Sequence, residues 1–124
     1  MPIRVLVDAE NVRRSVWPNL TKLDLCERVA VWAKLRGLAP VVVFDGPAPE
    51  CEGEIEVVGT LGESADDWLA REARAYAERG ESFWLVTSDR ELRRRAGPGA
   101  EKIAGGGSFA RELRALGPAA DSAP

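Results

Sequence analysis

Short apolar runs along the chain mark the positions where buried strands are expected. The clearest are residues 3–7 (IRVLV), 41–44 (VVVF) and 83–87 (FWLVT), while residues 54–59 (EIEVVG) form a weaker one. A further short strand is expected near residues 101–103. Runs of this length, rich in β-branched residues, are typical of strands that are covered on both faces of a parallel sheet.

Apolar residues at helical spacing predict helices between these strands. Residues 23–37 form one helix, with Thr21 as its N-cap and Gly37 as its C-terminal stop. Residues 65–79 form a second helix, which Gly80 closes.

Two more helices are expected in the last third of the chain. Ser88 begins one of them, with Glu91 three residues later completing a capping box. The other runs from about residue 108 to 116, after a glycine run at 105–107 that matches no phosphate-binding motif and is interpreted as a flexible connection.

The order of these elements predicts the fold class. Strand, helix, strand, strand, helix, strand, helix, strand, helix is the order of an α/β domain with a mainly parallel central sheet and right-handed crossovers. Residues 1–117 are expected to form this domain, and residues 118–124, which are small and polar or proline, a disordered tail.

Composition excludes several classes of function. With 124 residues, 45% of them apolar and 30% charged, the chain can bury one core. It has no apolar run of the roughly 18 residues that a membrane span needs, and its start does not resemble a signal peptide, so a cytoplasmic location without membrane contact is expected. Two cysteines do not make a disulfide framework, and the absence of histidine excludes Ser-His and Cys-His nucleophile pairs and the usual zinc sites.

Acidic residues follow the predicted strands in a repeated manner. Asp8 follows the first strand, Asp45 the second, and Asp89 comes two residues after the strand at 83–87. Asp66 and Asp67 begin the central helix. In parallel α/β sheets these positions share the rim formed by the carboxyl ends of the strands, where ligands bind.

Such a cluster needs a counter-charge. Two carboxylates about 4 Å apart repel by roughly 4 kcal/mol at an effective dielectric constant near 20. Carboxylate oxygens without histidine or thiolate favour Mg²⁺ or Mn²⁺. A hard ion in that position can activate water and stabilise a phosphodiester in transit, so the sequence suggests phosphodiester cleavage.

Each acid also has a simpler structural interpretation. Asp67 fits the acidic form of a capping box with Ser64, and a first-turn acid is favoured by the helix dipole. Asp66 is harder to explain in this way because one cap suffices, whereas Asp89 can be a first-turn acid and Asp45 a turn former before Gly-Pro. The aspartate after the first strand is also compatible with a turn, so the chemical hypothesis depends on the coincidence of these acids at one rim.

Four segments resemble a known family. They are VLVDAEN (5–11), ESADDWLAREA (63–73), VTSDRELRRRA (86–96) and GGGSFARELRAL (105–116). In order and spacing they resemble the NYN domain of the YacP-like type, within the PIN-like and FLAP nuclease group, over residues 3 to 116.

The resemblance implies a Rossmann-like, three-layer α/β/α fold and a metal-dependent endoribonuclease that uses Mg²⁺ or Mn²⁺. The family's catalytic positions fall on Asp8, Asn11, Asp66 and Asp89, and the implied metal ligands are Asp8, Asp66, Asp67 and Asp89. Asn11 would orient a water or a phosphate oxygen, and Asp67 or Glu10 would assist a second ion.

Two departures from the family pattern concern the substrate contacts more than the metal site. The usual Asp-Gly-Tyr-Asn is Asp8-Ala9-Glu10-Asn11 here, which loses a tyrosine and adds a carboxylate. The connection GPAPECEG between the second and third strands is shorter than usual.

RNA, single-stranded or messenger, is the partner expected from the resemblance, and the ribosome is one candidate for presenting it. Since the formal net charge is −3, RNA contacts must come from a local basic patch. The arginines that border the predicted rim are Arg13, Arg14, Arg90, Arg93 and Arg94, followed by Arg95.

The run RELRRRA is equally typical of a solvated helix with cations in its last turn. Among the tryptophans, Trp17 and Trp68 are the expected exposed candidates for base stacking, while Trp32 and Trp84 fit the core pattern.

Two rival functions belong to other classes. The first is a PIN-like module that binds RNA or a ribonucleoprotein without catalysis. The second is a Mg²⁺-dependent phosphatase, which would need a second aspartate two residues after Asp8; Asn11 has neither the right identity nor the right spacing.

Overall fold

A five-stranded parallel sheet forms the centre of the molecule. The computed structural model describes residues 2–116, so the tail predicted at 118–124 lies outside the described residues. The strand order is β3-β2-β1-β4-β5, and every neighbouring pair is parallel. The strands are β1 (Arg4–Asp8), β2 (Ala39–Asp45), β3 (Glu56–Thr60), β4 (Phe83–Val86) and β5 (Lys102–Ala104).

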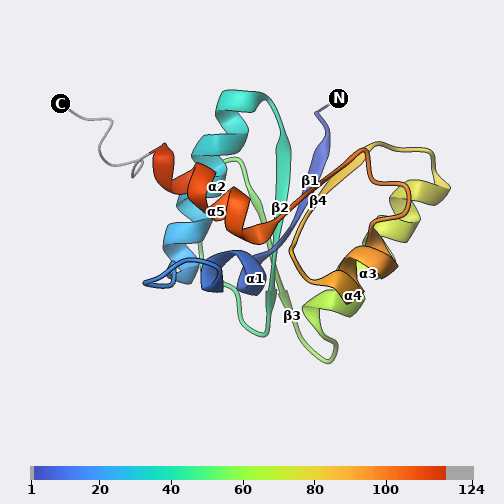
Figure 1. The fold of residues 1–124 in the computed structure, drawn as a ribbon, viewed down its shortest axis with the longest axis horizontal. Coiled ribbons are helices and arrows are strands. Elements are labelled where there is room, and N and C mark those ends of the chain that lie inside the picture. The colour runs from blue at the N-terminus through green and yellow to red at the C-terminus, as the bar shows by residue number, and fades with distance from the viewer. Residues whose placement is uncertain (1, 117–124) are drawn as a thin grey trace.

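Helices cover both faces of this sheet (Figure 1). One face carries α1 (Ala9–Arg14), α2 (Lys22–Arg36) and α5 (Gly106–Ala115), and the other carries α3 (Ala65–Glu78) and α4 (Arg90–Ala96). The predicted α/β class with three layers and a parallel sheet is therefore confirmed. Within residues 2–116, no helix has both the length and the apolar character that crossing a membrane requires.

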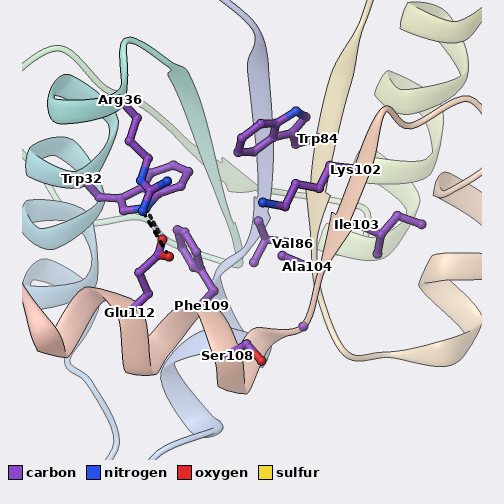
Figure 2. A pocket seen from close by; sticks show the side chains of 11 residues that line it. Trp32, Arg36, Trp84, Val86, Lys102, Ile103, Ala104, Ser108, Phe109 and Glu112 are labelled. Atoms are coloured by element: carbon purple, nitrogen blue, oxygen red, sulfur yellow. Dashed lines mark hydrogen bonds and ion pairs between the residues drawn. The ribbon is translucent and has the colours of Figure 1, made fainter.

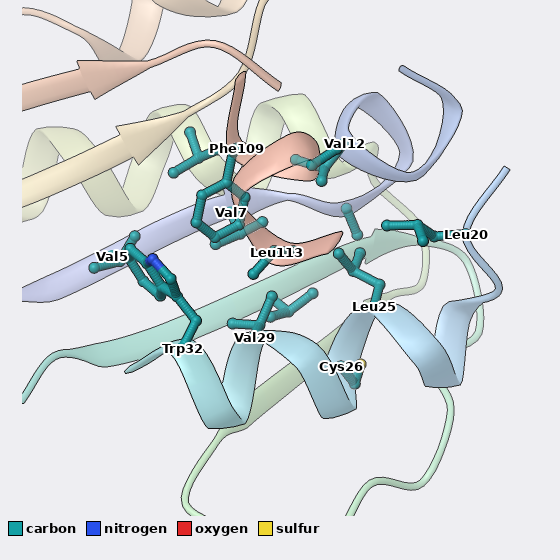
Figure 3. Close-up of a cluster of buried hydrophobic side chains, with 14 of the residues drawn as sticks. Val5, Val7, Val12, Leu20, Leu25, Cys26, Val29, Trp32, Phe109 and Leu113 are labelled. Atoms are coloured by element: carbon teal, nitrogen blue, oxygen red, sulfur yellow. The ribbon is translucent and has the colours of Figure 1, made fainter. Parts of the chain in front are cut away.

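The central strand β1 supplies side chains to both cores. Val5 and Val7 pack under α1, α2 and α5, whereas Leu6 packs under α3 and α4. This alternation follows from the opposite directions of successive side chains in a strand, and it explains why β1 reads as a continuous apolar run. Figure 3 shows the larger core, in which Leu25, Val29, Trp32, Phe109 and Leu113 close over the sheet.

The predicted helix caps of α2 and α3 are confirmed. The hydroxyl of Thr21 accepts a hydrogen bond from the backbone N–H of Asp24 at 3.0 Å, and Ser64 caps α3 in the same way. Gly37 ends α2 with a φ of 67°, a left-handed conformation that glycine adopts without steric cost.

Three helix starts differ from the sequence prediction. The six-residue helix α1 was not predicted, because it buries only Ala9 and Val12 and is too short to show a period. Helix α4 is capped by Asp89 instead of Ser88, and Glu91 pairs with Arg94 instead of closing a capping box. Helix α5 begins at Gly106, inside the glycine run that was expected to be a flexible connection.

Candidate active site

A cleft of about 400 Å³ lies at the carboxyl ends of β1 and β4. The chain leaves β1 toward one face of the sheet and leaves β4 toward the other, so this is the topological switch point where α/β folds bind ligands. The residues that line this acidic cleft are Asp8, Glu10, Asn11, Arg14, Ser15, Asp66, Ser88 and Asp89. The structure thus brings together the four residues predicted as catalytic.

Asp8 is the most buried acid of the acidic cleft. Its side chain closes β1 with only 6% of the residue exposed, and the Thr87 hydroxyl donates a hydrogen bond of 2.9 Å to its Oδ2. No arginine or lysine of residues 2–116 forms an ion pair with it. Burial, together with the charges of Asp66 and Asp89, raises the pKa of Asp8 to about 6, although the Thr87 bond acts in the opposite direction.

Asp66 faces the same space from the start of α3. Burial and the charge of Asp89 raise its pKa above the usual range, against the attraction of Arg95. Asp45, at the end of β2, also contributes to this rise, but it is exposed and does not line the acidic cleft. The like charges therefore influence one another, as expected for acids at one rim.

Asp89 lines the acidic cleft and also caps helix α4. Its Oδ1 accepts a hydrogen bond of 2.9 Å from the backbone N–H of Leu92 and so caps α4. Its own N–H donates to the hydroxyl of Thr87, at 3.1 Å. Thr87 therefore connects Asp89 to Asp8, and both carboxylates are held by fixed partners.

The acids do not form a preassembled metal site. Among residues 2–116, no three acidic or cysteine side chains are close enough to hold a metal ion together. The donor chemistry nevertheless fits a hard cation, since the acidic cleft is lined by carboxylate oxygens and two of the acids have raised pKa values. Without a cation between them, like charges favour separation.

Asn11 acts as a brace between three segments. Its Oδ1 accepts a hydrogen bond of 2.9 Å from the N–H of Ser88, and the Ser88 hydroxyl accepts one of 2.8 Å from the N–H of Gly106. A Cβ at Gly106 would lie 2.1 Å from the Asn11 oxygen, so only glycine allows this approach. The sequence did not reveal the roles of Thr87, Ser88 and Gly106, since their partners are far away along the chain.

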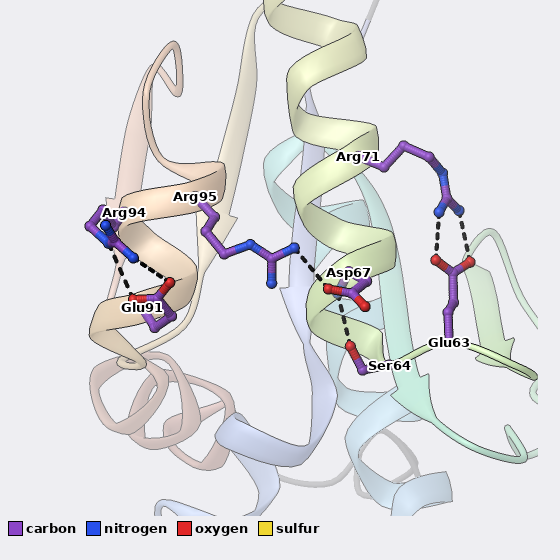
Figure 4. A network of polar contacts seen from close by, with 7 residues as sticks. All are labelled: Glu63, Ser64, Asp67, Arg71, Glu91, Arg94 and Arg95. Atoms are coloured by element: carbon purple, nitrogen blue, oxygen red, sulfur yellow. Dashed lines mark hydrogen bonds and ion pairs between the residues drawn. The ribbon is translucent and has the colours of Figure 1, made fainter.

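Asp67 is not brought to the acidic cleft (Figure 4). Its backbone N–H donates to the Ser64 hydroxyl at 3.1 Å, and its carboxylate accepts a hydrogen bond of 2.8 Å from Arg95. This bond with Arg95 lowers the pKa of Asp67. Its neighbour Asp66 is thus the acid of this pair that faces the acidic cleft.

Most of the predicted RNA-binding arginines have partners within the protein. Arg13 binds Glu10 and the carbonyl of Leu20, at 2.9 and 3.0 Å. Arg93 donates to the carbonyl of Thr87 at 2.8 Å. Arg94 forms an ion pair with Glu91, which Figure 4 also shows.

Two arginines are better placed for a ligand. Arg14 lines the acidic cleft and is exposed, although its guanidinium also contacts Glu10 at 3.0 Å. Arg90 follows Asp89 directly, is exposed, and forms no ion pair with the described part of the chain.

Glu10 has one carboxylate oxygen that is not paired with an arginine. This oxygen, Oε2, is buried and has no hydrogen-bond partner among residues 2–116.

The exposure of the four tryptophans agrees with the prediction except at Trp68. Trp17 is 85% exposed, as expected, in the segment that follows Ser15. Trp68, the other residue expected to be exposed, is partly buried against the core under α3. Trp32 and Trp84 pack in the opposite core, as predicted.

Comparisons with known proteins identify the fold. No family model matches the chain, and no curated protein does. The crystal structure of Rae1 (YacP) from Bacillus subtilis matches with a TM-score of 0.71 at 24% identity, over 94% of this chain and 75% of that one. A point mutant of the same protein matches with a TM-score of 0.72 at 22% identity, over 92% and 76% of the two chains. The chain shares the fold of these structures, so the YacP-like resemblance of its motifs is confirmed at the level of the fold.

The raised pKa of Asp8 predicts how stability depends on pH. Because the pKa is about 6 in the folded protein against 3.8 for an ordinary aspartate, the folded state binds more protons between these values. The free energy of unfolding without metal should therefore fall as pH rises from about 4 to about 6, by about 2 kcal/mol. Asp8→Asn should remove this fall, as measured by urea unfolding in EDTA at several pH values. Asp45→Asn is the control, and an unchanged pH dependence in Asp8→Asn would contradict the assignment.

The close contact between Asn11 and Gly106 predicts that alanine at Gly106 and alanine at Gly107 change the free energy of unfolding differently. Gly106→Ala should lower the free energy of unfolding by about 2 kcal/mol, because the new methyl group collides with Asn11. Gly107→Ala should leave it unchanged or raise it by up to about 1 kcal/mol, because alanine favours a helix and the added Cβ has room. It would meet the flexible end of Arg111 at 3.4 Å and Ser15 Cβ at an ordinary contact distance of 4.0 Å. Equal effects in thermal or urea unfolding would show that the brace does not constrain Gly106.

Proposed function

We propose that the protein is a metal-dependent endoribonuclease that hydrolyses RNA phosphodiester bonds in the acidic cleft. The observation that carries the proposal is the meeting of Asp8, Asp66 and Asp89 at the switch point of the sheet. The resemblance of the motifs to YacP-like NYN domains and the fold shared with Rae1 (YacP) support it.

Asp8, Asp66 and Asp89 are the residues that would hold Mg²⁺ or Mn²⁺. Glu10 also lines the acidic cleft, but it would have to release Arg13 and Arg14 to assist a second ion. When bound, such an ion neutralises the acids, lowers the pKa of water and stabilises charge on the phosphodiester. Carboxylates without histidine favour these hard ions over zinc. Binding would offset the burial and the like charges that together raise the pKa values of Asp8 and Asp66.

The protein's own groups would position the substrate. Thr87 holds Oδ2 of Asp8 and so fixes the orientation of this carboxylate in the lining of the acidic cleft. The oxygen of Asn11 is committed to Ser88, so its amide group is the part that can donate to a phosphate oxygen. Below about pH 6, a proton on Asp8 would weaken cation binding, so cleavage should decline in acid.

RNA contact would depend on a few local groups, because the net charge is −3. Arg14 lies in the wall of the acidic cleft and Arg90 lies on the first turn of α4. Arginine suits phosphate because its planar group donates two parallel hydrogen bonds. Trp17, two residues after Ser15 of the cleft lining, offers an exposed aromatic surface on which an unpaired base can stack. Single-stranded RNA is the substrate that this arrangement favours.

A rival function is RNA binding without catalysis. One observation favours it, namely that no three acidic or cysteine side chains within residues 2–116 are assembled for a metal ion. Against it stands the buried Asp8, since a binding module has no use for a buried carboxylate among like charges. A cleavage assay separates the two functions.

Adjacent aspartates give the sharpest test of the proposed function. With single-stranded RNA and Mn²⁺, Asp8→Asn and Asp66→Asn should each reduce the rate of cleavage by about 100-fold or more, because each removes a charge that holds the ion. Asp67→Asn should stay within about threefold of the wild type, since Asp67 is bound to Arg95 outside the acidic cleft.

Two outcomes would contradict the proposal. Wild-type rates in both Asp8→Asn and Asp66→Asn would exclude the acidic cleft as the site of cleavage. Binding of RNA by the wild-type protein with no cleavage in Mg²⁺ or Mn²⁺ would favour the rival function.

A further inference from the structure

A second cavity lies on the face of the sheet that carries α2 and α5 (Figure 2). Its volume is about 330 Å³, and β4, β5, α2 and α5 enclose it. Val86 and Ala104 lie between Trp84 on one side and Phe109 on the other. We call it the aromatic cleft.

Glu112, the carboxylate that lines the aromatic cleft, has a cationic partner within the protein. Glu112 forms an ion pair with Arg36 at 3.2 Å, and its other oxygen accepts a hydrogen bond from the Trp32 indole. Glu101 accepts a hydrogen bond of 3.0 Å from the Trp84 indole. The charge of Glu112 is thus balanced by Arg36, whereas Glu101 keeps its charge but does not line the aromatic cleft.

Lys102 supplies the unbalanced charge of the aromatic cleft. Its Nζ lies 4.7 Å from the centre of the Trp84 ring, and no carboxylate of residues 2–116 forms an ion pair with it. The ammonium group thus lies over an aromatic ring of the aromatic cleft, without a counter-ion among residues 2–116. Such a pair of an aromatic surface and a cation suits a ligand with a planar ring and a negative group.

The aromatic cleft adjoins the acidic cleft. Gly105 and Ser108 line the aromatic cleft, and Ser88 lines the acidic cleft. The hydrogen bond of 2.8 Å from the N–H of Gly106 to the Ser88 hydroxyl joins these two linings. A strand that has a phosphate in the acidic cleft can therefore continue into the aromatic cleft over the start of α5.

We propose that the aromatic cleft binds one unpaired nucleotide of the RNA strand whose neighbouring phosphodiester lies in the acidic cleft. The base lies on the apolar surface between Trp84 and Phe109, and Lys102 contacts a phosphate oxygen. This inference rests on the proposed function, since it names how the substrate is held. It requires single-stranded RNA, because a paired base cannot enter a cavity of this size.

A peptide added along the open edge of β5 is the competing occupant. Ile103 is 40% exposed on this edge strand, and it also lines the aromatic cleft. The unpaired cation and the contact with the acidic cleft nevertheless favour a nucleotide.

Two charge-reversal variants, Lys102→Glu and the control Lys34→Glu, test the proposal through the affinity for RNA, without a cleavage assay. In an Asp8→Asn background with EDTA, the affinity for a fluorescein-labelled single-stranded hexaribonucleotide is measured by anisotropy at fixed salt. Lys102→Glu should weaken binding about fivefold or more, because a phosphate contact is replaced by repulsion. Lys34→Glu, the same change on the exposed outer side of α2, should stay within about twofold.

NMR spectroscopy tests whether the base of the nucleotide binds in the aromatic cleft. Adenosine 5′-monophosphate added to ¹⁵N-labelled protein should shift the indole N–H signal of Trp84 and the amide signals of Gly105 and Ser108. Ribose 5-phosphate, which lacks the base, should shift them much less. Lys102→Glu should reduce the shifts caused by the nucleotide.

Equal affinities of Lys102→Glu and Lys34→Glu, or shifts that avoid Trp84, would overturn the proposal even if the wild type cleaves RNA. Absence of cleavage by the wild type with the expected Trp84 shifts would instead reject the nuclease function and leave a nucleotide-binding cleft. The two failures are thus distinguishable.

Discussion

Burial of a carboxylate among like charges at the carboxyl end of β1 is the constraint on which the candidate site depends. The apolar run of β1 buries the strand between two helical layers, so Asp8 at its end is buried as well. The parallel topology brings Asp89 to the neighbouring strand end and Asp66 to the same rim. The result is a carboxyl group whose pKa is raised to about 6 and to which residues 2–116 offer the Thr87 hydroxyl but no ion-pair partner. The missing counter-charge is what a divalent ion would supply.

A small polar framework holds this rim in place. Thr87 contacts both Asp8 and Asp89, while Asn11 reaches Ser88, which in turn receives the N–H of Gly106. All of these bonds except the one between Asp89 and Thr87 join segments that are distant in sequence, so the framework fixes the ends of β1 and β4 against the start of α5. The same framework forms the boundary between the acidic cleft and the aromatic cleft.

The sequence predicted most of the fold because its signals are local. Apolar runs identified the strands, and helical periods with the caps Thr21 and Ser64 identified α2 and α3. Helix α1 escaped prediction because six residues with two buried side chains show no period. The position of Asp89 as the cap of α4 was missed because its neighbour Ser88 is an equally good capping residue by type.

The candidate site was predictable in outline and not in detail. The rule that strand ends share a rim brought Asp8 and Asp66 together, whereas the pairing of Asp67 with Arg95 joins positions 28 residues apart and leaves no local signal. The aromatic cleft was hidden for a similar reason, since Trp84 fits a core pattern and its pairing with Lys102 appears only in three dimensions.

The most direct test of the central claim is a crystal structure with Mn²⁺, recorded at a wavelength where manganese scatters anomalously. The account predicts an anomalous peak in the acidic cleft, with carboxylate oxygens of Asp8, Asp66 and Asp89 turned toward it directly or through water. No peak there at millimolar Mn²⁺ and pH 8, with the three carboxylates still apart, would contradict it.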